Sequence, residues 1–213
     1  MDEVLERLKD GIRRFRREVY PEQEEHYKRV MSEPQRPHAL IITCADSRLH
    51  PDTLTQAAPG DVFVTRNIGN MVPAYPEMLG GVSAVLEFAV SAMKVEHIAV
   101  CGHSDCGAMK ALLDPATVEA MPTVKAWLRN AHAALAVAKA IQQAAGAGTL
   151  GDQDLLRIVT EQNVLLQVQH VRTHPAVAGA IARGELEVSG WVYDIAQGEV
   201  RICEGGAFEL VEW

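Results

Sequence analysis

Two short segments of the sequence contain residue types that could bind a metal ion or move protons. In the first, an apolar run that starts at residue 39 ends in Cys44, Asp46 and Arg48 at alternate positions. Successive side chains of an extended segment point to opposite faces, so these three side chains would share one face. Taken alone, they allow two interpretations: a thiolate, a carboxylate and a guanidinium that act together, or a buried cysteine beside an ion pair that closes a turn.

The second segment favours the chemical interpretation. Another apolar run, residues 97–101, is followed by His103 and Cys106. Ligands of open parallel sheets bind outside the carboxyl ends of the strands, so the loops after two neighbouring strands can meet in one crevice. Cys44, His103 and Cys106 would then offer two thiolates and an imidazole, which suit Zn²⁺. Three ligands are typical of a catalytic zinc site, which keeps one position for water, whereas a structural site uses four.

The other cysteines and histidines have no comparable spacing. Cys101 ends a predicted strand and Cys203 lies near the C-terminus, and we interpret both as small buried residues. His170 and His174 are four residues apart, but a zinc-protease helix would carry glutamate after the first histidine, and valine stands there. We interpret them as ordinary core or surface histidines. His50 lies near the first segment, where a simple role in the loop is favoured over proton transfer.

The elements that must position these residues predict an α/β fold with a mostly parallel central sheet flanked by helices. Residues 39–43, 62–65 and 97–101 are short apolar runs without strict alternation, as expected of parallel strands covered on both faces. Near the C-terminus, residues 186–193 and 199–203 alternate and flank a turn, which predicts a strand pair at one edge of the sheet. Flanking helices are predicted at 77–94, at 122–145, from an Asp152 cap to residue 172, and at 175–183.

The N-terminal residues predict two amphipathic helices. Residues 2–18 place apolar side chains at helical spacing, and Pro21 suits the first turn of a second helix that runs to about residue 31. These two helices cannot bury themselves alone, so they would cover either this domain or a neighbouring subunit. We therefore expect a single domain over residues 1–213, with residues 1–34 as an N-terminal helical arm.

The composition narrows the class of partner. The 213-residue chain has a formal net charge of -8, which argues against nucleic acid because nucleic-acid-binding surfaces are usually basic. No apolar run reaches the ~18 residues of a membrane span, and the N-terminus lacks the apolar stretch of an export signal. We expect a cytoplasmic protein that acts on a small molecule and uses cysteines as metal ligands rather than in disulfides.

Three motifs together resemble those of the β-class carbonic anhydrases. They are Cys-Ala-Asp-Ser-Arg at 44–48, Arg-Asn-Ile-Gly-Asn at 66–70 and Gly-His-Ser-Asp-Cys-Gly at 102–107. The similarity extends over nearly the whole chain. Further segments look like the bacterial, cyanate-operon-associated branch of that family, and they lie at 121–128, 161–164, 174–175 and 190–194.

The resemblance implies a zinc enzyme. One Zn²⁺ per chain would be held by Cys44, His103 and Cys106, and a zinc-bound hydroxide would convert CO2 reversibly to bicarbonate and a proton. Asp46 would accept a hydrogen bond from the hydroxide, and Arg48 would keep Asp46 ionised and turned away from the metal. The residues that the resemblance assigns to substrate binding are Gln35, Gly107, Phe63, Ile68 and Phe88.

Two further expectations come with the resemblance. Family members that close their site in acid and bind an inhibitory bicarbonate carry tryptophan three residues before the first cysteine. Ile41 stands at that position, so we expect an open site at neutral pH. Family members assemble as dimers or larger even-numbered oligomers, so we expect a homo-oligomer, either a dimer or a tetramer.

Two other functions remain open at this point. Hydrolysis of a sulfur analogue such as carbonyl sulfide would use the same ligands with a different pocket shape. A zinc-stabilised structural module would instead close the fourth ligand position and tolerate substitution of Asp46 or Arg48.

Overall fold

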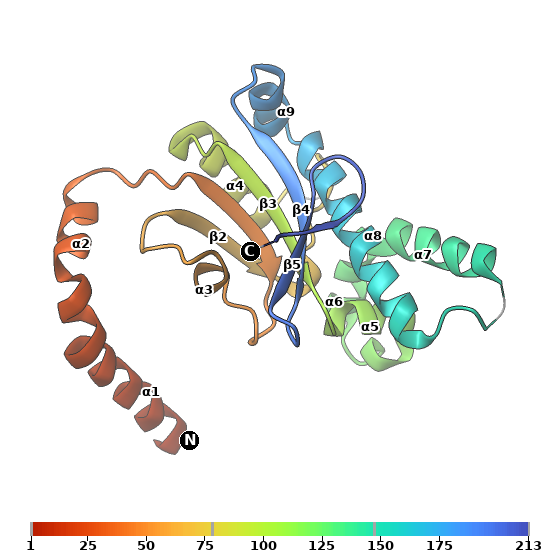
Figure 1. Ribbon diagram of the computed structural model, residues 1–213, viewed down its shortest axis with the longest axis horizontal. Helices are drawn as coiled ribbons and strands as arrows, with labels where there is room; N and C mark the ends of the chain where they lie inside the picture. Colours follow the sequence, from red (N-terminus) through yellow and green to blue (C-terminus); the bar gives the residue numbers. More distant parts are fainter. Residues whose placement is uncertain (1, 78, 147, 213) are drawn as a thin grey trace. The chain divides into compact units, whose positions relative to one another are not determined.

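A six-stranded sheet is the centre of the larger of two units into which the chain divides (Figure 1). This unit is Pro37–Trp213, and the other is Met1–Arg36. The computed structural model describes residues 2–77, 79–146 and 148–212.

The sheet is mostly parallel, as the sequence predicts. Its strand order is β2-β1-β3-β4-β5-β6, in which the first four strands are parallel and the last two antiparallel to their neighbours. The predicted C-terminal strand pair is β4 and β5, and the short β6 follows it at the edge. The strands are Ala39–Cys44 (β1), Val62–Asn67 (β2), His97–His103 (β3), Glu187–Asp194 (β4), Glu199–Cys203 (β5) and Glu209–Leu210 (β6).

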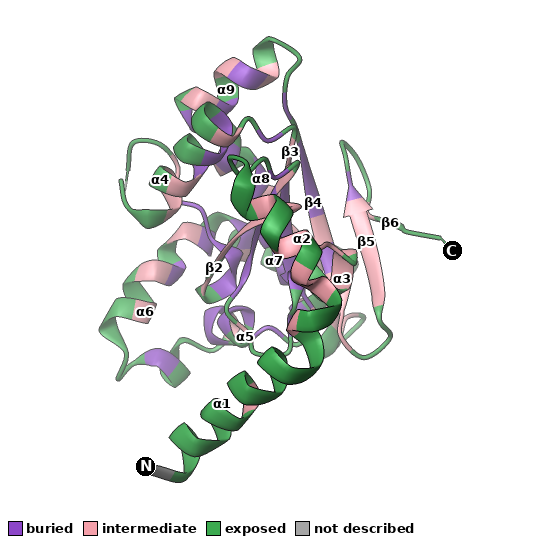
Figure 2. Cartoon of the chain, turned by 90° about the vertical axis from the view of Figure 1, so that its left-hand side faces the viewer, coloured by how far each residue is buried: buried purple, intermediate pink, exposed green. Residues whose placement is uncertain are grey.

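One face of the sheet carries the main hydrophobic core. Alternate residues of β1 and β3 point to this face, where Leu40, Ile42, Ile98 and Val100 are fully buried. Figure 2 shows the buried residues concentrated in the central strands and in the helix sides that face them. The helices that pack here are α4 (Gly81–Phe88), α8 (Asp152–Thr173) and α9 (Pro175–Ala182).

Helix α8 approaches the sheet very closely at Val164. A Cβ atom at Gly190 of β4 would lie 2.7 Å from Val164 Cγ1, and a Cβ atom at Gly102 of β3 would lie 2.7 Å from Val164 Cγ2. Packed carbon atoms normally sit about 3.5–4.0 Å apart. Only glycine at these two strand positions therefore allows the helix to come this near.

The opposite face of the sheet carries a smaller core. Ile41, Ala99 and Cys101 are buried there, and Leu54 of α3 (Pro51–Thr55) and Trp191 of β4 pack against them. Five consecutive residues of β1, from 40 to 44, are consequently buried. This agrees with the expectation that the parallel strands are covered on both faces.

The predicted helix at 77–94 begins later than expected. Glu77 lies in a turn, Met78 is outside the described residues, and α4 starts at Gly81 after an extended Gly80. The predicted start was wrong because two successive glycines disfavour a helical turn. After α4 the chain continues as a π-helical segment, Ala89–Met93.

The predicted helix at 122–145 is interrupted. It consists of α6 (Pro122–Trp127), a 3₁₀ segment over 128–131, and α7 (His132–Ala145). The indole N–H of Trp127 donates to the Ile68 carbonyl at 2.9 Å, and the Asn130 side chain donates to the Trp127 carbonyl at 2.8 Å. The bond from Asn130 occupies a backbone carbonyl of this segment and competes with the helical ladder, so the chain tightens at this point.

The predicted cap of α8 was also wrong. Asp152 is the first helical residue, and the Gly151 N–H donates to the Asp154 carboxylate at 3.1 Å. The helix that follows, α9, matches its predicted start at Pro175.

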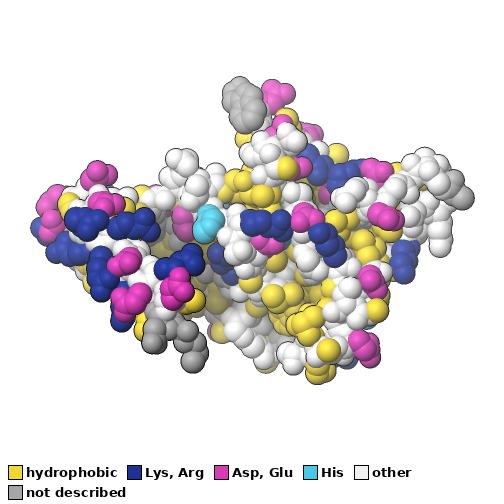
Figure 3. All heavy atoms as spheres, turned by 90° about the horizontal axis from the view of Figure 1, so that it is seen from below, with side chains coloured by type: hydrophobic (Ala, Val, Ile, Leu, Met, Phe, Trp, Pro, Cys, Tyr) yellow, Lys and Arg dark blue, Asp and Glu magenta, His cyan; other side chains and the backbone are white. Residues whose placement is uncertain are grey.

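The N-terminal unit is helical from Asp2 to Ser32. Its segments are α1 (Asp2–Arg14), a π-helical stretch over 15–19, and α2 (Tyr20–Ser32), and Pro21 lies in the first turn of α2 as predicted. Figure 3 shows cationic and anionic side chains interspersed over this unit. Apolar side chains of α1 are exposed, including Val4 and Ile12. Within the described part of the chain, no helix combines the length and apolar content needed to cross a bilayer.

Candidate metal centre

The carboxyl ends of β1 and β3 bring together the three residues with metal-ligand chemistry. The two strands are hydrogen-bonded neighbours, with Thr43 opposite Cys101, so the loops that follow them leave the same edge of the sheet. One ligand atom each from Cys44, His103 and Cys106 lies within 4.8 Å of the others. All three residues are buried. Two sulfurs and one imidazole nitrogen at this separation can hold a metal ion, and the donor set suits Zn²⁺.

The hydrogen bonds of His103 favour a role as a metal ligand. Its Nδ1 lies 2.8 Å from the Ser104 carbonyl, which makes Nδ1 the donor and leaves a lone pair on Nε2. Nε2 is buried and has no hydrogen-bond partner among the described residues. Burying an unpaired polar atom is costly, so a ligand at Nε2 would remove an unfavourable feature of the site.

Cys44, His103 and Cys106 are called the metal trio below, and the two cysteines of this trio are coupled by their proximity. A hydrogen bond from the Cys106 thiol lowers the pKa of Cys44 to about 4, against the opposing effect of burial. His103 and the backbone amides of Gly69 and Asp46 contribute to the same lowered pKa of Cys44. The site therefore favours a thiolate at Cys44, which is the protonation state that binds metal.

Asp46 is held by Arg48 through both carboxylate oxygens. Arg48 Nε donates to Asp46 Oδ1 at 2.9 Å, and Arg48 Nη2 donates to Asp46 Oδ2 at 2.8 Å. This forked pair holds the pKa of Asp46 well below its usual range. Asp46 Oδ2 lies 3.9 Å from His103 Nε2, so an ionised carboxylate stands beside the metal trio.

Four further contacts fix this loop. Arg48 Nη1 donates to Asp105 Oδ2 at 3.0 Å, and Lys110 pairs with the same carboxylate. Arg66 of β2 donates to the backbone carbonyls of Cys44 and Asp46, at 3.1 Å and 2.6 Å. The positions of the Cys44 backbone and of the Arg48 guanidinium are therefore set by residues from three other segments of the chain.

Two of the predicted substrate residues, Ile68 and Gly107, lie close to the metal ligands in the fold. Ile68 is half exposed and follows Asn67, which pairs with Cys44 in the sheet. Gly107 is the first residue of α5 (Gly107–Leu113), directly after Cys106, and a Cβ there would meet nothing within 4 Å. The amide of a first helical residue has no partner inside the helix, so it is available to an anion.

Two more of the predicted substrate residues, Phe63 and Phe88, lie farther from the metal ligands. Phe63 pairs with Leu40 in the sheet. Leu40 lies four residues before Cys44 in β1, which corresponds to about 13 Å along the strand. Its ring centroid is 6.2 Å from that of Phe88, which is half exposed. Gln35 is exposed and belongs to the N-terminal unit. The substrate roles of these residues stay predictions.

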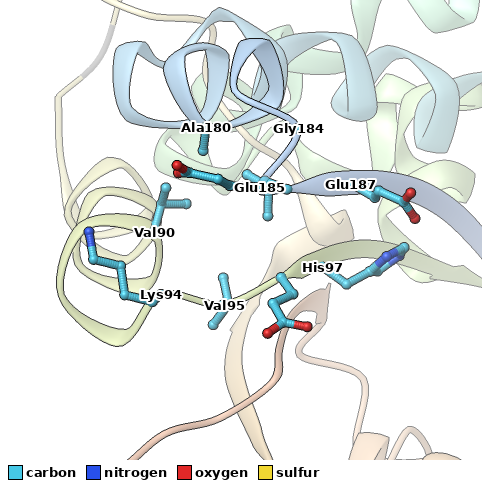
Figure 4. A pocket seen from close by; sticks show the side chains of 10 residues that line it. Val90, Lys94, Val95, His97, Ala180, Gly184, Glu185 and Glu187 are labelled. Carbon is cyan, nitrogen blue, oxygen red and sulfur yellow. The ribbon is translucent and has the colours of Figure 1, made fainter.

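A cavity of about 720 Å³ lies at the other end of the same strands (Figure 4). His97 and Glu187, the first residues of β3 and β4, line it together with Lys94 and Glu185. The length of β3, about 20 Å, separates this cavity from the metal trio, so it is not part of the candidate centre.

Some residues that support the centre have no role in the sequence-based prediction. Asp105 lies between His103 and Cys106 in the sequence, and its carboxylate accepts a hydrogen bond from Arg48 Nη1, the guanidinium nitrogen that Asp46 does not use. Asn163 and Gln167 are buried on α8, where Asn163 donates to the Gly69 carbonyl at 3.1 Å. In the sequence, two amide side chains four residues apart on a largely apolar helix face could have indicated a buried hydrogen-bond network, because buried amides require partners.

Comparisons with known proteins agree with this centre. A family model described as carbonic anhydrase matches residues 39–200. A carbonic anhydrase of Pseudomonas aeruginosa is 43% identical over 202 residues, which cover 95% of this chain and 89% of that protein. The solved structure of the β-carbonic anhydrase CcaA superposes with a TM-score of 0.90 at 34% identity, covering 99% of this chain and 93% of that one. The chain belongs to the β-class carbonic anhydrase family.

A third relative extends the structural likeness of this β-class carbonic anhydrase. A tetrameric β-carbonic anhydrase of Sordaria macrospora is 27% identical with a TM-score of 0.82, covering 97% of this chain and 99% of that one. The family predicted from the three motifs is thus confirmed, and the branch within it stays a prediction.

Proposed function

We propose that the chain catalyses the reversible hydration of CO2 to bicarbonate and a proton, with Cys44, His103 and Cys106 as the ligands of one Zn²⁺. The observation that carries this proposal is the buried Nε2 of His103, which has no hydrogen-bond partner in the described part of the chain and lies next to two thiols in a member of this family. When bound, Zn²⁺ supplies a Lewis acid that lowers the pKa of a coordinated water toward about 7.

Asp46 and Arg48 are proposed to control the group that faces the metal trio. An ionised Asp46 can only accept hydrogen bonds, so it selects and orients a partner that still carries a proton. Because Arg48 engages both Asp46 oxygens, the carboxylate is restrained from turning toward the trio. This restraint supports the prediction of an open site at neutral pH, as does Ile41 in place of tryptophan.

The substrate pocket is proposed to be shared between subunits. Ile68 and Gly107 are adjacent to the ligands of their own chain, whereas Phe63 and Phe88 form a ring pair about 13 Å along the strand from the level of Cys44. We propose that this ring pair and Gln35 serve the metal site of a neighbouring copy. The exposed apolar side chains of α1 support such an assembly, and the Sordaria macrospora relative is a tetramer.

Residues 1–34 are proposed as the helical arm of a single domain over 1–213. The cytoplasm is the proposed location because metal-binding thiols stay reduced there. The four cysteines of the chain are free and buried, which suits that environment.

The test of the proposed function combines stopped-flow CO2 hydration with zinc quantification. Cys44→Ala should lose both zinc and activity, while Cys101→Ala, a matched change at a buried cysteine outside the trio, should keep both. Parallel turnover of carbonyl sulfide checks the sulfur-analogue alternative. Zinc-replete protein that shows no hydration between about pH 7 and pH 9 would disprove the proposal, since the nucleophile should be ionised in that range.

A further inference from the structure

A chain of buried hydrogen bonds runs from the middle of α8 to the Gly69 carbonyl. Asn163 and Gln167 are four residues apart on α8 and are 1% and 0% exposed. Gln167 Nε2 donates to Asn163 Oδ1 at 2.9 Å, and Asn163 Nδ2 donates to the Gly69 carbonyl at 3.1 Å. Each amide therefore orients the next one in the chain.

The far end of this chain is anchored. Gln167 Oε1 accepts the Val72 N–H at 2.8 Å, and Gln167 Nε2 also donates to the Asn130 carbonyl at 3.1 Å. An amide with its donor and acceptor both engaged in a buried setting has little freedom to rotate. Gln167 therefore holds the Asn163 side chain in one orientation.

Gly69 joins the hydrogen-bond chain to the trio. It has a left-handed backbone with φ 75°, and a Cβ there would lie 2.9 Å from Ala108 Cβ, so its backbone is pressed against α5. Helix α5 begins directly after Cys106. Two residues before Gly69, Asn67 pairs with Cys44 in the sheet, and the backbone amide of Gly69 lowers the pKa of the Cys44 thiol. The carbonyl of Gly69 is therefore fixed by α8, and its amide belongs to the surroundings of a ligand.

We propose that Asn163 and Gln167 are positioning residues for the metal ligand Cys44. They fix Gly69 so that its N–H faces the sulfur and withdraws charge from the thiolate. The inference rests on the proposed function, because it concerns Cys44 as a zinc ligand. Partners that hold metal ligands in place typically change metal affinity or activity by about 10- to 100-fold when removed.

The test uses two substitutions at Asn163 in the full-length protein. Asn163→Leu removes the donor to Gly69 with the same branching at Cγ, and Asn163→Asp removes it at nearly equal volume while keeping an acceptor for Gln167. In protein loaded with Co²⁺, both should shift the thiolate-to-cobalt charge-transfer band to lower energy, because a sulfur without an N–H partner gives up charge more readily. The dissociation constant for zinc, measured by chelator competition, should rise about 10- to 100-fold.

A matched control comes from the same helix and the same loop. Thr173 Oγ1 accepts the Tyr75 N–H at 2.9 Å, six residues beyond Gly69, so Thr173→Val should weaken the fold without moving the cobalt band. An unchanged band with zinc affinity within twofold of the parent in both Asn163 variants would overturn the inference, as would an equal shift in Thr173→Val. A parent protein that binds neither ion would instead refute the proposed function.

Discussion

Replacing Gly190 by alanine tests the close contact between α8 and the sheet. The added Cβ would lie 2.7 Å from Val164 Cγ1 and 3.4 Å from Val168 Cγ2. Packed carbons need about 3.5–4.0 Å, so α8 or the Val164 side chain must move by about 1 Å. Gly190 lies within β4, where alanine adds no backbone strain, so the cost is overpacking. We expect the free energy of unfolding to fall by about 2 kcal/mol.

Val164→Ala completes a double-mutant cycle. Removing two buried methyl groups costs about 0.8 kcal/mol each, or about 2 kcal/mol with the remaining cavity. In the protein that carries both Gly190→Ala and Val164→Ala, the new methyl group occupies the space that the valine leaves. The double variant should therefore be no less stable than Val164→Ala alone, which corresponds to a coupling energy of about 2 kcal/mol.

Guanidinium unfolding at one fixed protein concentration measures the cycle, because assembly would otherwise shift the transition. Two losses that add to within about 0.5 kcal/mol would refute the reasoning, since independent sites are additive to that extent. Zinc affinity gives a second readout. Because α8 also carries Asn163, Gly190→Ala should weaken zinc binding, and the second substitution should restore it.

Other residues give narrower predictions. Burial lowers the pKa of His174, so the free energy of unfolding should decrease as the pH falls below about 6.5, where the unfolded chain takes up the proton. In unfolding titrations, His174→Gln should reduce this dependence, and an unchanged slope would contradict the assignment. Asp105→Asn should lower kcat/KM for CO2 hydration several-fold by freeing Arg48, while stability changes by less than about 1 kcal/mol because the pair is half exposed. Equal kcat/KM would show that Asp46 alone holds the guanidinium. In metal-free protein at about pH 6, iodoacetamide should modify Cys44 before Cys101, as judged by peptide mass spectrometry. The Cys106 hydrogen bond lowers the pKa of Cys44 to about 4, whereas burial raises the pKa of Cys101 to about 12, so the reverse order would contradict the prediction.

The strands and the metal trio were predictable because they depend on local patterns. Each parallel strand is a short apolar run, and the polar residues that follow β1 and β3 mark the edge where loops meet. Helix boundaries were less predictable where side chains compete with the backbone. The bond from Asn130 to the Trp127 carbonyl competes with the backbone of one helix, and the Asp154 carboxylate moves the cap of another to Gly151.

Contacts between distant segments could not be read from the sequence. Asn163 looks like one polar residue on a helix until its partner, 94 residues away, is known. Asp105 looks like an ordinary loop carboxylate until the fold brings Arg48 to it across 57 residues. Phe63 is an apolar residue of a strand, and only the sheet register shows its distance from the level of Cys44. Each of these cases requires knowledge of the tertiary arrangement.

The long separation between Gly69 and Asn163 also sets an order of events during synthesis. The chain grows from its N-terminus, so Cys44, His103 and Cys106 are all made before α8 exists. At that stage Gly69 has no Asn163 to hold its carbonyl, and the Cys44 sulfur lacks the amide that the finished fold presents to it. A nascent chain can therefore hold all three ligands and still bind zinc weakly. The proposed role of Asn163 therefore predicts that secure loading of the metal follows the synthesis of α8.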